Sequence, residues 1–330
     1  MSTLKKEMKI KTCFHHQKDK CKGKIKQAHS IQKNGRLSII EGDVNGNQCI
    51  YTFTSCIVSE KSALEDLVPI GKKEASTFFG FCDYHDSTLF SPIENFEFDG
   101  SDKHCFLHSY RSFAHSYHRK NEEAQVFSDQ ESIFIKRFPK IVIEKMLLGA
   151  TLGLKDMAPF KSKLDHMIQN EIYDGLEYLV YEKKGVFPIA VSSLMSPKVS
   201  YKNYPMNNHI DPDIPYSQLM ITFLPDKNKT IVILAAFEED TKSIRLLNEL
   251  DELYDYYLEK AISSLIIANC ENTFFSPLFW NSLSKKEKRA LLDEFLVNTE
   301  TLKYHNSFFT SKFNFFHPKY EINRLKNNFH

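Results

Sequence analysis

Apolar residues recur at helical spacing through the middle of the chain. Between Asp102 and Phe127 they occupy positions 106, 107, 110, 113, 114 and 117, which share one face of a helix. Residues 129–180 continue the pattern in three further apolar runs. The spacing therefore predicts a helical region over residues 101–184.

Three later segments change to the short apolar runs that are typical of strands. Residues 187–195, 216–225 and 229–237 are rich in branched and aromatic side chains, and a tight turn that starts at Pro225 joins the last two. A turn this short favours antiparallel pairing. The pattern predicts a C-terminal α+β domain over residues 185–330, with a small antiparallel sheet.

Helical spacing returns after this predicted sheet. It covers residues 243–269 and 284–297, and the second helix opens with Ser284 followed three residues later by Glu287. This combination is a capping box, in which each side chain satisfies the backbone N–H of the other residue. We expect a helix to start directly after Ser284.

The first hundred residues contain weaker strand signals. Runs at 37–40 and 49–58 flank the sequence Gly-Asp-Val-Asn-Gly-Asn at 42–47, whose Asn-Gly pair favours a hairpin turn. Within residues 75–90, the sequence Cys-Asp-Tyr-His-Asp-Ser-Thr-Leu-Phe at 82–90 suits a short helix, entered from a turn at Gly80. The whole chain is therefore expected to be α+β, with residues 1–100 forming a module of their own.

Charge is balanced overall, with 43 basic and 42 acidic residues, but it is distributed unevenly. Ten lysines lie between Met1 and Lys33, opposed there by Glu7 and Asp19 alone. A basic segment of this kind favours nucleic acid as a partner. The N-terminus lacks the apolar core of a signal peptide, and no run of about 18 apolar residues follows. We therefore expect a cytoplasmic protein without a membrane partner.

Cysteine and histidine are concentrated in the first part of the chain. Six of the seven cysteines and eight of the thirteen histidines precede residue 120. An odd number of cysteines without a secretory signal argues against a disulfide framework and favours metal binding or simple burial.

Four of these residues have the composition of a structural zinc site. Cys82 and His85 form a close pair with two residues between them, while Cys13 and Cys21 form a pair with seven residues between them. Zinc binds four nitrogen or sulfur ligands in a tetrahedron, usually as two such pairs. A metal would also stabilise a module with few large apolar clusters. Alternative ligands stay open: they are His15, His16, Cys49 and Cys56.

The N-terminal segments resemble the HNH, or ββα-metal, endonuclease superfamily, whose treble-clef zinc scaffold presents residues to a second metal ion. The matching parts are the Cys13/Cys21 pair, Lys26–Gln32 and Lys73–Asp86. These parts are also similar to a group of bacterial proteins without an assigned function. The resemblance covers about residues 10–100.

The resemblance implies a role for two further residues. His29 matches the general base that activates water, and Asp86 matches a ligand of catalytic Mg²⁺ or Mn²⁺. The chain departs from the pattern at Ala28, where the family usually has a metal ligand. The asparagine that orients the base has three candidates, which are Asn34, Asn45 and Asn47.

Three functions follow as expectations. The first is a metal-dependent HNH-like nuclease that acts on DNA or RNA, in a context such as bacterial defence against phage. The second is a zinc-stabilised adaptor that binds nucleic acid, or a protein partner through its C-terminal domain, without catalysis. The third is a metal-independent RNase, because Arg111 and His118 resemble the motif of HEPN ribonucleases.

Arg111 and His118 belong to a stripe of polar residues on the predicted helix 102–127. Its members are His104, His108, Arg111, His115 and His118, spaced by three or four residues. The alternative interpretation is a solvated polar face of an amphipathic helix.

Three other segments have a functional and a structural interpretation. His209, Asp211 and Asp213 suit either a divalent cation or a turn. Residues 271–280 suit packing of the C-terminal helices against the sheet. The Phe-rich tail after 299 suits either a strand laid on the C-terminal domain or stacking on bases. The chain contains no P-loop, dinucleotide-binding or nucleophile-elbow motif, which disfavours those enzyme classes.

Overall fold

The computed structural model describes residues 9–53, 66–129, 138–207, 211, 213–299 and 307–328. The chain forms two compact units that interleave in sequence. The first comprises Met1–Ser30, Thr77–Gly175 and Asp211–Pro215, and the second comprises Ile31–Ser76, Leu176–Ile210 and Tyr216–His330. The fold is mixed α+β, as predicted, with a Cys3His group near the N-terminus and a helical middle.

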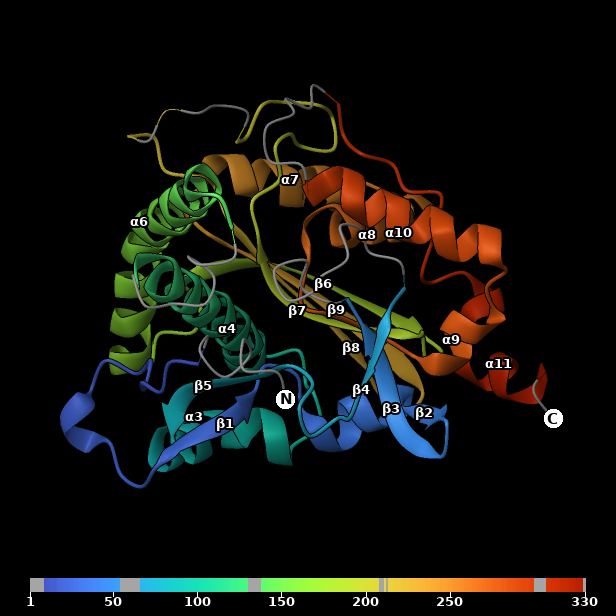
Figure 1. The fold of residues 1–330 in the computed structure, drawn as a ribbon, viewed down its shortest axis with the longest axis horizontal. Helices are drawn as coiled ribbons and strands as arrows, with labels where there is room; N and C mark the ends of the chain where they lie inside the picture. The colour runs from blue at the N-terminus through green and yellow to red at the C-terminus, as the bar shows by residue number, and fades with distance from the viewer. Residues whose placement is uncertain are drawn as a thin grey trace. The chain divides into compact units, whose positions relative to one another are not determined.

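The first unit contains a two-stranded antiparallel sheet that is followed directly by a helix (Figure 1). Strand β1 (Ile25–His29) pairs with β5 (Thr77–Cys82), and α3 (Asp83–Asn95) follows β5 without a break. The register shifts between Lys26 and Ala28, so the strands form a bulge there. A short 3-10 turn, η1 (Lys18–Lys20), precedes β1.

Two long helices complete the first unit: α4 (Asp102–Ser128) and α6 (Lys140–Asn170). The helix predicted at 102–127 is confirmed, and the hydroxyl of Ser101 caps it by accepting the N–H of His104. An aromatic core packs α4 against the rest of this unit. Its members are Phe14, Phe81 and Phe90, together with Tyr110 and Phe113 of α4 itself.

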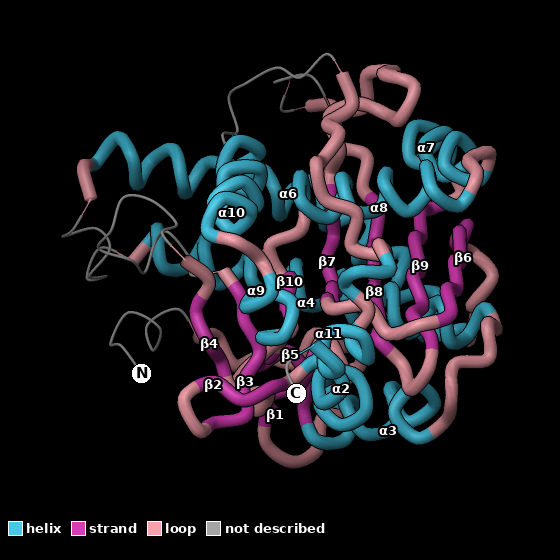
Figure 2. The backbone as a smooth tube through the Cα atoms, turned by 90° about the vertical axis from the view of Figure 1, so that its right-hand side faces the viewer, coloured by secondary structure: helices cyan, strands magenta, loops and turns pink. Residues whose placement is uncertain are grey.

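The second unit is built on an eight-stranded antiparallel sheet, shown in Figure 2. The strands follow the order β2-β3-β10-β7-β8-β9-β6, and β4 also pairs with β3. Their bounds are β2 (Gly42–Val44), β3 (Asn47–Thr52), β4 (Val68–Ile70), β6 (Leu176–Lys184), β7 (Ile189–Met195), β8 (Leu219–Pro225), β9 (Lys229–Phe237) and β10 (Thr273–Phe275). The predicted strands at 187–195, 216–225 and 229–237 are therefore confirmed.

Helices of the second unit pack against this sheet. They are η2 (Lys33–Leu37), α2 (Ser38–Ile40), α7 (Thr241–Asp251), α8 (Asp255–Asn269), α9 (Pro277–Ser282), α10 (Lys285–Thr299), η3 (Pro318–Tyr320) and α11 (Ile322–Asn328). The capping box is confirmed, because Ser284 and Glu287 each accept the backbone N–H of the other. Alternate residues of β7, β8 and β9, such as Val191, Ile221 and Leu234, form the core with these helices.

Three local predictions were wrong. Residues 38–40 form α2 and not a strand, because a four-residue apolar run does not distinguish the two. The short helix predicted at 82–90 is confirmed as the start of α3, but the turn predicted at Gly80 was wrong, because Gly80 lies inside β5. Residues 176–180 were predicted to be helical, but they form the start of β6. Helix α6 ends before them, at Glu171, which has the left-handed conformation (φ 54°).

The Asn-Gly hairpin is confirmed, with Asn45 at φ 55° and Gly46 at φ 81° between β2 and β3. The predicted second strand, 49–58, is present up to Thr52, and its residues beyond 53 lie outside the described part of the chain.

The aromatic segments near the C-terminus are structural. Residues 271–280 form β10 and most of α9, with Phe275, Phe279 and Trp280 buried, as the packing interpretation predicted. In the tail, Phe315 and Phe316 are fully buried in the core, so they offer no surface for base stacking. The described residues 307–328 of the tail contain η3 and α11 and no strand. No described helix is long and apolar enough to cross a membrane.

Candidate metal centre

Backbone pairing with β5 fixes the position of Cys13. The N–H of Thr12 donates to the carbonyl of Phe79 (3.2 Å), and the N–H of Phe14 donates to the carbonyl of Gly80 (2.6 Å). The ring of Phe14 then packs edge-on against Tyr110, 5.5 Å between centroids. Cys13 therefore lies beside the strand that ends at the second ligand pair.

Cys21 follows the η1 turn, where its N–H donates to the carbonyl of Lys18 (3.2 Å). The chain then reverses at Gly23, whose φ of +74° favours glycine. A Cβ at Gly23 would lie 2.4 Å from Oδ2 of Asp83, so the backbone passes very close to the start of α3. Asp83 in turn donates its N–H to the carbonyl of Lys24 (3.0 Å).

Cys82 and His85 stand on the first turn of α3. Cys82 is the N-cap of the helix, and its sulfur accepts the backbone N–H of His85 at 3.5 Å. Both side chains are buried, with 1% and 2% of their surface exposed. A helix N-terminus stabilises negative charge, which favours the thiolate form of Cys82.

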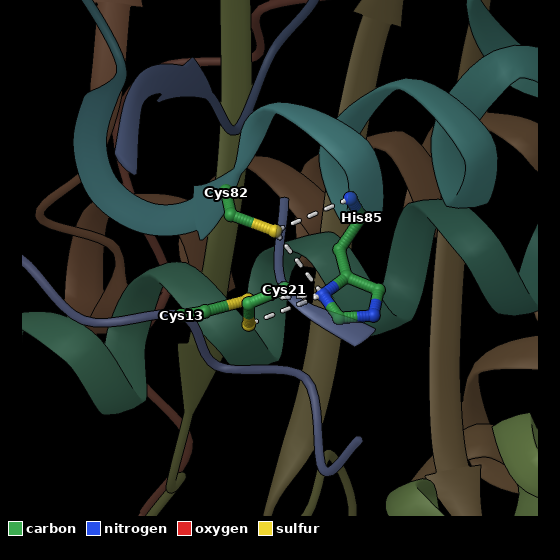
Figure 3. A group of neighbouring side chains, drawn as sticks. All are labelled: Cys13, Cys21, Cys82 and His85. Carbon is green, nitrogen blue, oxygen red and sulfur yellow. Dashed lines mark hydrogen bonds between the residues drawn. The ribbon is translucent and has the colours of Figure 1, made fainter. Parts of the chain in front are cut away.

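The four side chains meet with their ligand atoms toward one another (Figure 3). Nδ1 of His85 lies 3.4, 3.7 and 3.3 Å from the sulfurs of Cys13, Cys21 and Cys82, and all four atoms lie within 4.8 Å of one another. Bond lengths of about 2.3 Å to sulfur and 2.1 Å to nitrogen give a tetrahedral S···N edge of about 3.6 Å. The group can therefore hold a metal ion.

The pKa values of Cys82 and Cys21 are shifted in opposite directions. Burial raises the pKa of Cys82, whereas the backbone N–H groups of His85 and Lys22, which donate to its sulfur, lower it. The lowering is the larger effect, so the pKa lies below its ordinary value. Burial and the neighbouring Cys13 thiol raise the pKa of Cys21 to about 12. Thiols that lie close together resist ionisation, because their negative charges would repel one another. A bound cation removes this repulsion and favours the thiolate form.

The long loop between Cys13 and Cys21 contains two imidazoles that stack on the centre. The ring of His15 lies 3.9 Å from that of His85 at an angle of 8°, and 4.5 Å from that of His16. Burial, followed by the nearby His85, lowers the pKa of His15 to about 3, so its ring is neutral. Neither His15 nor His16 belongs to the ligand group. The alternative in which one of them replaces Cys13 or Cys21 as a ligand is therefore not supported.

His29 and Asp86 do not join a second ligand group among the described residues. Gln27 donates to Thr77 (2.9 Å), the pairing partner of His29, so Gln27 and His29 share one face of the β1/β5 sheet. The opposite face carries Lys26, which reaches Ser87 of α3 (3.2 Å). The joint role of His29 and Asp86 stays a prediction.

Asp86 takes part in a buried charge cluster that the sequence analysis did not identify. Oδ1 of Asp86 is buried without a hydrogen-bond partner among the described residues, and burial raises the pKa of this carboxyl although Arg111 lowers it. Arg111 pairs with Glu94 (2.6 Å) and stacks on Phe90 (4.0 Å). The spacing of residues 86, 90 and 94 on one helix face could have indicated this cluster.

The polar stripe on α4 is buried, so the solvated-face interpretation was wrong. Its histidines and Arg111 are all at most 7% exposed. His118 lies 3.3 Å from Glu122, and Arg111 pairs with Glu94, so each member of the HEPN-like pair has its own carboxylate partner. His115 packs edge-on against Phe78, 5.3 Å between centroids.

The remaining candidates lie elsewhere. Cys49 lies in β3 outside the ligand group, and Cys56 and His209 lie outside the described residues. Asp213 donates its N–H to Asp211 (2.9 Å) and pairs with Lys155 (3.1 Å), as in an ordinary turn. Asn34, Asn45 and Asn47 all belong to the second unit.

No family model, curated protein or solved structure matches this chain. The candidate centre therefore stands on its own geometry.

Proposed function

We propose that this protein is a zinc-stabilised nucleic-acid-binding protein, and that lysines around the metal centre contact the phosphate backbone. Three sulfurs and one imidazole nitrogen form a ligand set that zinc prefers, and a closed set of four suits a structural ion. Two cysteines, an antiparallel strand pair and a helix follow one another in the order that the treble-clef scaffold of the resemblance implies, although residues 30–76 separate the two strands.

The observation that carries this proposal is the exposure of four lysines next to the centre. Lys18, Lys20, Lys22 and Lys24, here called the lysine rim, are all exposed, and none forms an ion pair with a described carboxylate. Within residues 18–24, Asp19 is the one acidic residue, and the carboxylate of Asp83 accepts the N–H of Lys24 at 3.2 Å. Unpaired ammonium groups held on a metal-anchored loop are suited to displace counterions from a phosphate backbone.

Two contacts give the rim a defined form. Lys18 donates to the carbonyl of Cys13, and Lys22 lies 5.6 Å from the centre of the Tyr84 ring. Tyr84 is itself 38% exposed at the first turn of α3. An exposed aromatic ring beside lysines can stack on an unpaired base, which favours single-stranded nucleic acid.

The test is binding of labelled single- and double-stranded oligonucleotides, followed by fluorescence anisotropy across a series of salt concentrations. The variant Lys20→Ala/Lys22→Ala/Lys24→Ala keeps Lys18, which contacts Cys13. We expect weaker binding, with the slope of log K against log salt reduced by about one per lysine that contacts phosphate.

The matched control removes three exposed lysines of the second unit, Lys285, Lys286 and Lys326. It should bind as the wild type does. An unchanged affinity and salt slope in the rim variant would reject the proposal, and so would an equal loss in the control.

Hydrolysis of the bound nucleic acid is a second candidate function, favoured by one observation. The buried, unpartnered Oδ1 of Asp86 is a carboxylate oxygen of the kind that binds Mg²⁺ or Mn²⁺. In the HNH-like interpretation, Asp86 would hold this ion and His29 would activate water.

Cleavage of plasmid DNA and RNA with Mg²⁺ or Mn²⁺ tests this candidate. Asp86→Asn and His29→Ala should each abolish cleavage while leaving binding to the lysine rim intact. Cleavage that survives both substitutions would exclude the assignment of these two residues.

A further inference from the structure

His85 lacks the hydrogen bond that usually orients a metal-binding imidazole. Its Nδ1 faces the three sulfurs, while its Nε2 is buried without a hydrogen-bond partner among the described residues. A ligating histidine commonly donates its second N–H to a carboxylate or a carbonyl, which fixes the plane of the ring. Another contact must fix the plane of His85.

The neighbouring ring of His15 is in position to do so. The two rings are nearly parallel, at 8°, with centroids 3.9 Å apart, so His15 covers one face of His85. His15 is 6% exposed, and its Nδ1 accepts the backbone N–H of Gln17 at 3.2 Å. The backbone of the loop therefore holds His15, and His15 can hold His85.

This arrangement gives a physical reason for the long spacing between Cys13 and Cys21. A spacing of two to four residues is usual for a ligand pair. Here seven residues separate the cysteines, and they bring His15 over the ring of the fourth ligand.

We propose that His15 is a positioning residue of the metal centre, which presents Nδ1 of His85 to the ion by stacking on its ring. The stacking face of His15 carries this role, and its nitrogens do not bind the ion. A flat ring at position 15 should therefore suffice. His16 stacks on the far side of His15 and should matter less.

The experiment uses the full chain loaded with Co²⁺, whose absorption bands report sulfur and nitrogen ligation, and competition with a chelator gives the affinity. His15→Ala should lower the affinity by about 10-fold or more, the usual cost of losing a contact that orients a ligand. His15→Phe keeps the flat face but loses the hydrogen bond from Gln17, so it should retain the wild-type spectrum and lose clearly less affinity than His15→Ala. The control His16→Ala should retain both the spectrum and the affinity.

Nitrogen NMR of His85 in the zinc-loaded chain supplies a second readout. The wild type and His15→Phe should show ligation through Nδ1, whereas His15→Ala should show a mixture of the two nitrogens or loss of the signal. If His15→Ala does not take up metal at all, His15→Leu replaces it, because leucine has similar bulk but no flat face.

Two results would overturn the proposal. One is a wild-type affinity and spectrum in His15→Ala or His15→Leu, which would remove any positioning role. The other is a loss in His15→Phe as large as in His15→Ala, which would show that a nitrogen of His15, and not its face, is required.

Discussion

The backbone N–H of His85 donates a hydrogen bond to the sulfur of Cys82 at 3.5 Å, so Cys82 caps helix α3 and also stands among the metal ligands. The start of the helix and the metal centre are thus coupled through one atom. Substitutions at this position can separate the two roles.

Serine and alanine at position 82 should differ as helix N-caps, but both should lose the stabilisation that zinc gives the wild type. Serine retains an N-cap acceptor, so in the presence of a chelator Cys82→Ser should be more stable than Cys82→Ala by about 1 kcal/mol. Both variants should lose the stabilisation that added zinc gives the wild type. Urea unfolding with chelator and with zinc measures both differences, and a zinc-dependent gain in either variant would contradict the coupling.

Alanine at Gly23 should destabilise the loop that carries Cys21. Gly23 has φ +74°, and a Cβ there would meet the side chain of Asp83 at 2.4 Å. Gly46 has a similar φ of +81° but no atom within 4 Å of such a Cβ. Gly46→Ala should therefore cost about 1 kcal/mol for the conformation alone, and Gly23→Ala clearly more. Equal losses of unfolding free energy would show that the close approach is unimportant.

His115 should make the protein sensitive to mild acid. Burial lowers its pKa to about 3, so the folded chain keeps the imidazole neutral while the unfolded chain binds a proton below about pH 6.5. This contribution to stability is present above pH 6.5 and is lost as pH falls toward 3, by about 1.4 kcal/mol per pH unit. The loss should therefore begin as soon as the pH drops below that of neutral solution.

Replacing the imidazole should remove that part of the pH dependence. Urea unfolding of zinc-loaded wild type and His115→Met at pH 7 and pH 5.5 should show a smaller drop for the variant. His166→Met is the control, because His166 is exposed, and it should follow the wild type. A variant His115→Met with the full wild-type drop would contradict the assignment.

Arg111 should matter more for stability than the neighbouring Arg119. The guanidinium of Arg111 is buried between Glu94 and the ring of Phe90, whereas the side chain of Arg119 is 46% exposed beside Glu122. Arg111→Met should cost about 3 kcal/mol, because it also removes the guanidinium that favours the charged form of Asp86. Arg119→Met should cost about 1 kcal/mol or less. The free energies of unfolding of the two variants provide the comparison, and similar values would contradict this ranking.

The sequence predicted those features that depend on local chemistry. The capping box at Ser284, the Asn-Gly turn and the helix at 102–127 all follow from the preferences of a few neighbouring residues. The Cys82/His85 half of the ligand set was also predictable, because a cysteine and a histidine at short spacing suit a metal site, whereas the sequence left alternatives open for the Cys13/Cys21 half.

Features that depend on distant parts of the chain could not be predicted. Strand β5 pairs with β1 across residues 31–76, which belong to the second unit, so no local pattern revealed β5. The α4 stripe resembles a solvated face in sequence, yet its polar residues are buried with partners such as Glu94 from α3. Burial of polar groups is decided by tertiary partners and not by periodicity.

The most direct test of the central claim is elemental analysis of the purified full chain. The wild type should contain one equivalent of zinc, and Cys82→Ser should contain far less. Cys49→Ser is the control, because Cys49 lies outside the ligand group, and it should keep the full equivalent. A full equivalent of zinc in Cys82→Ser, or none in the wild type, would contradict the proposed centre.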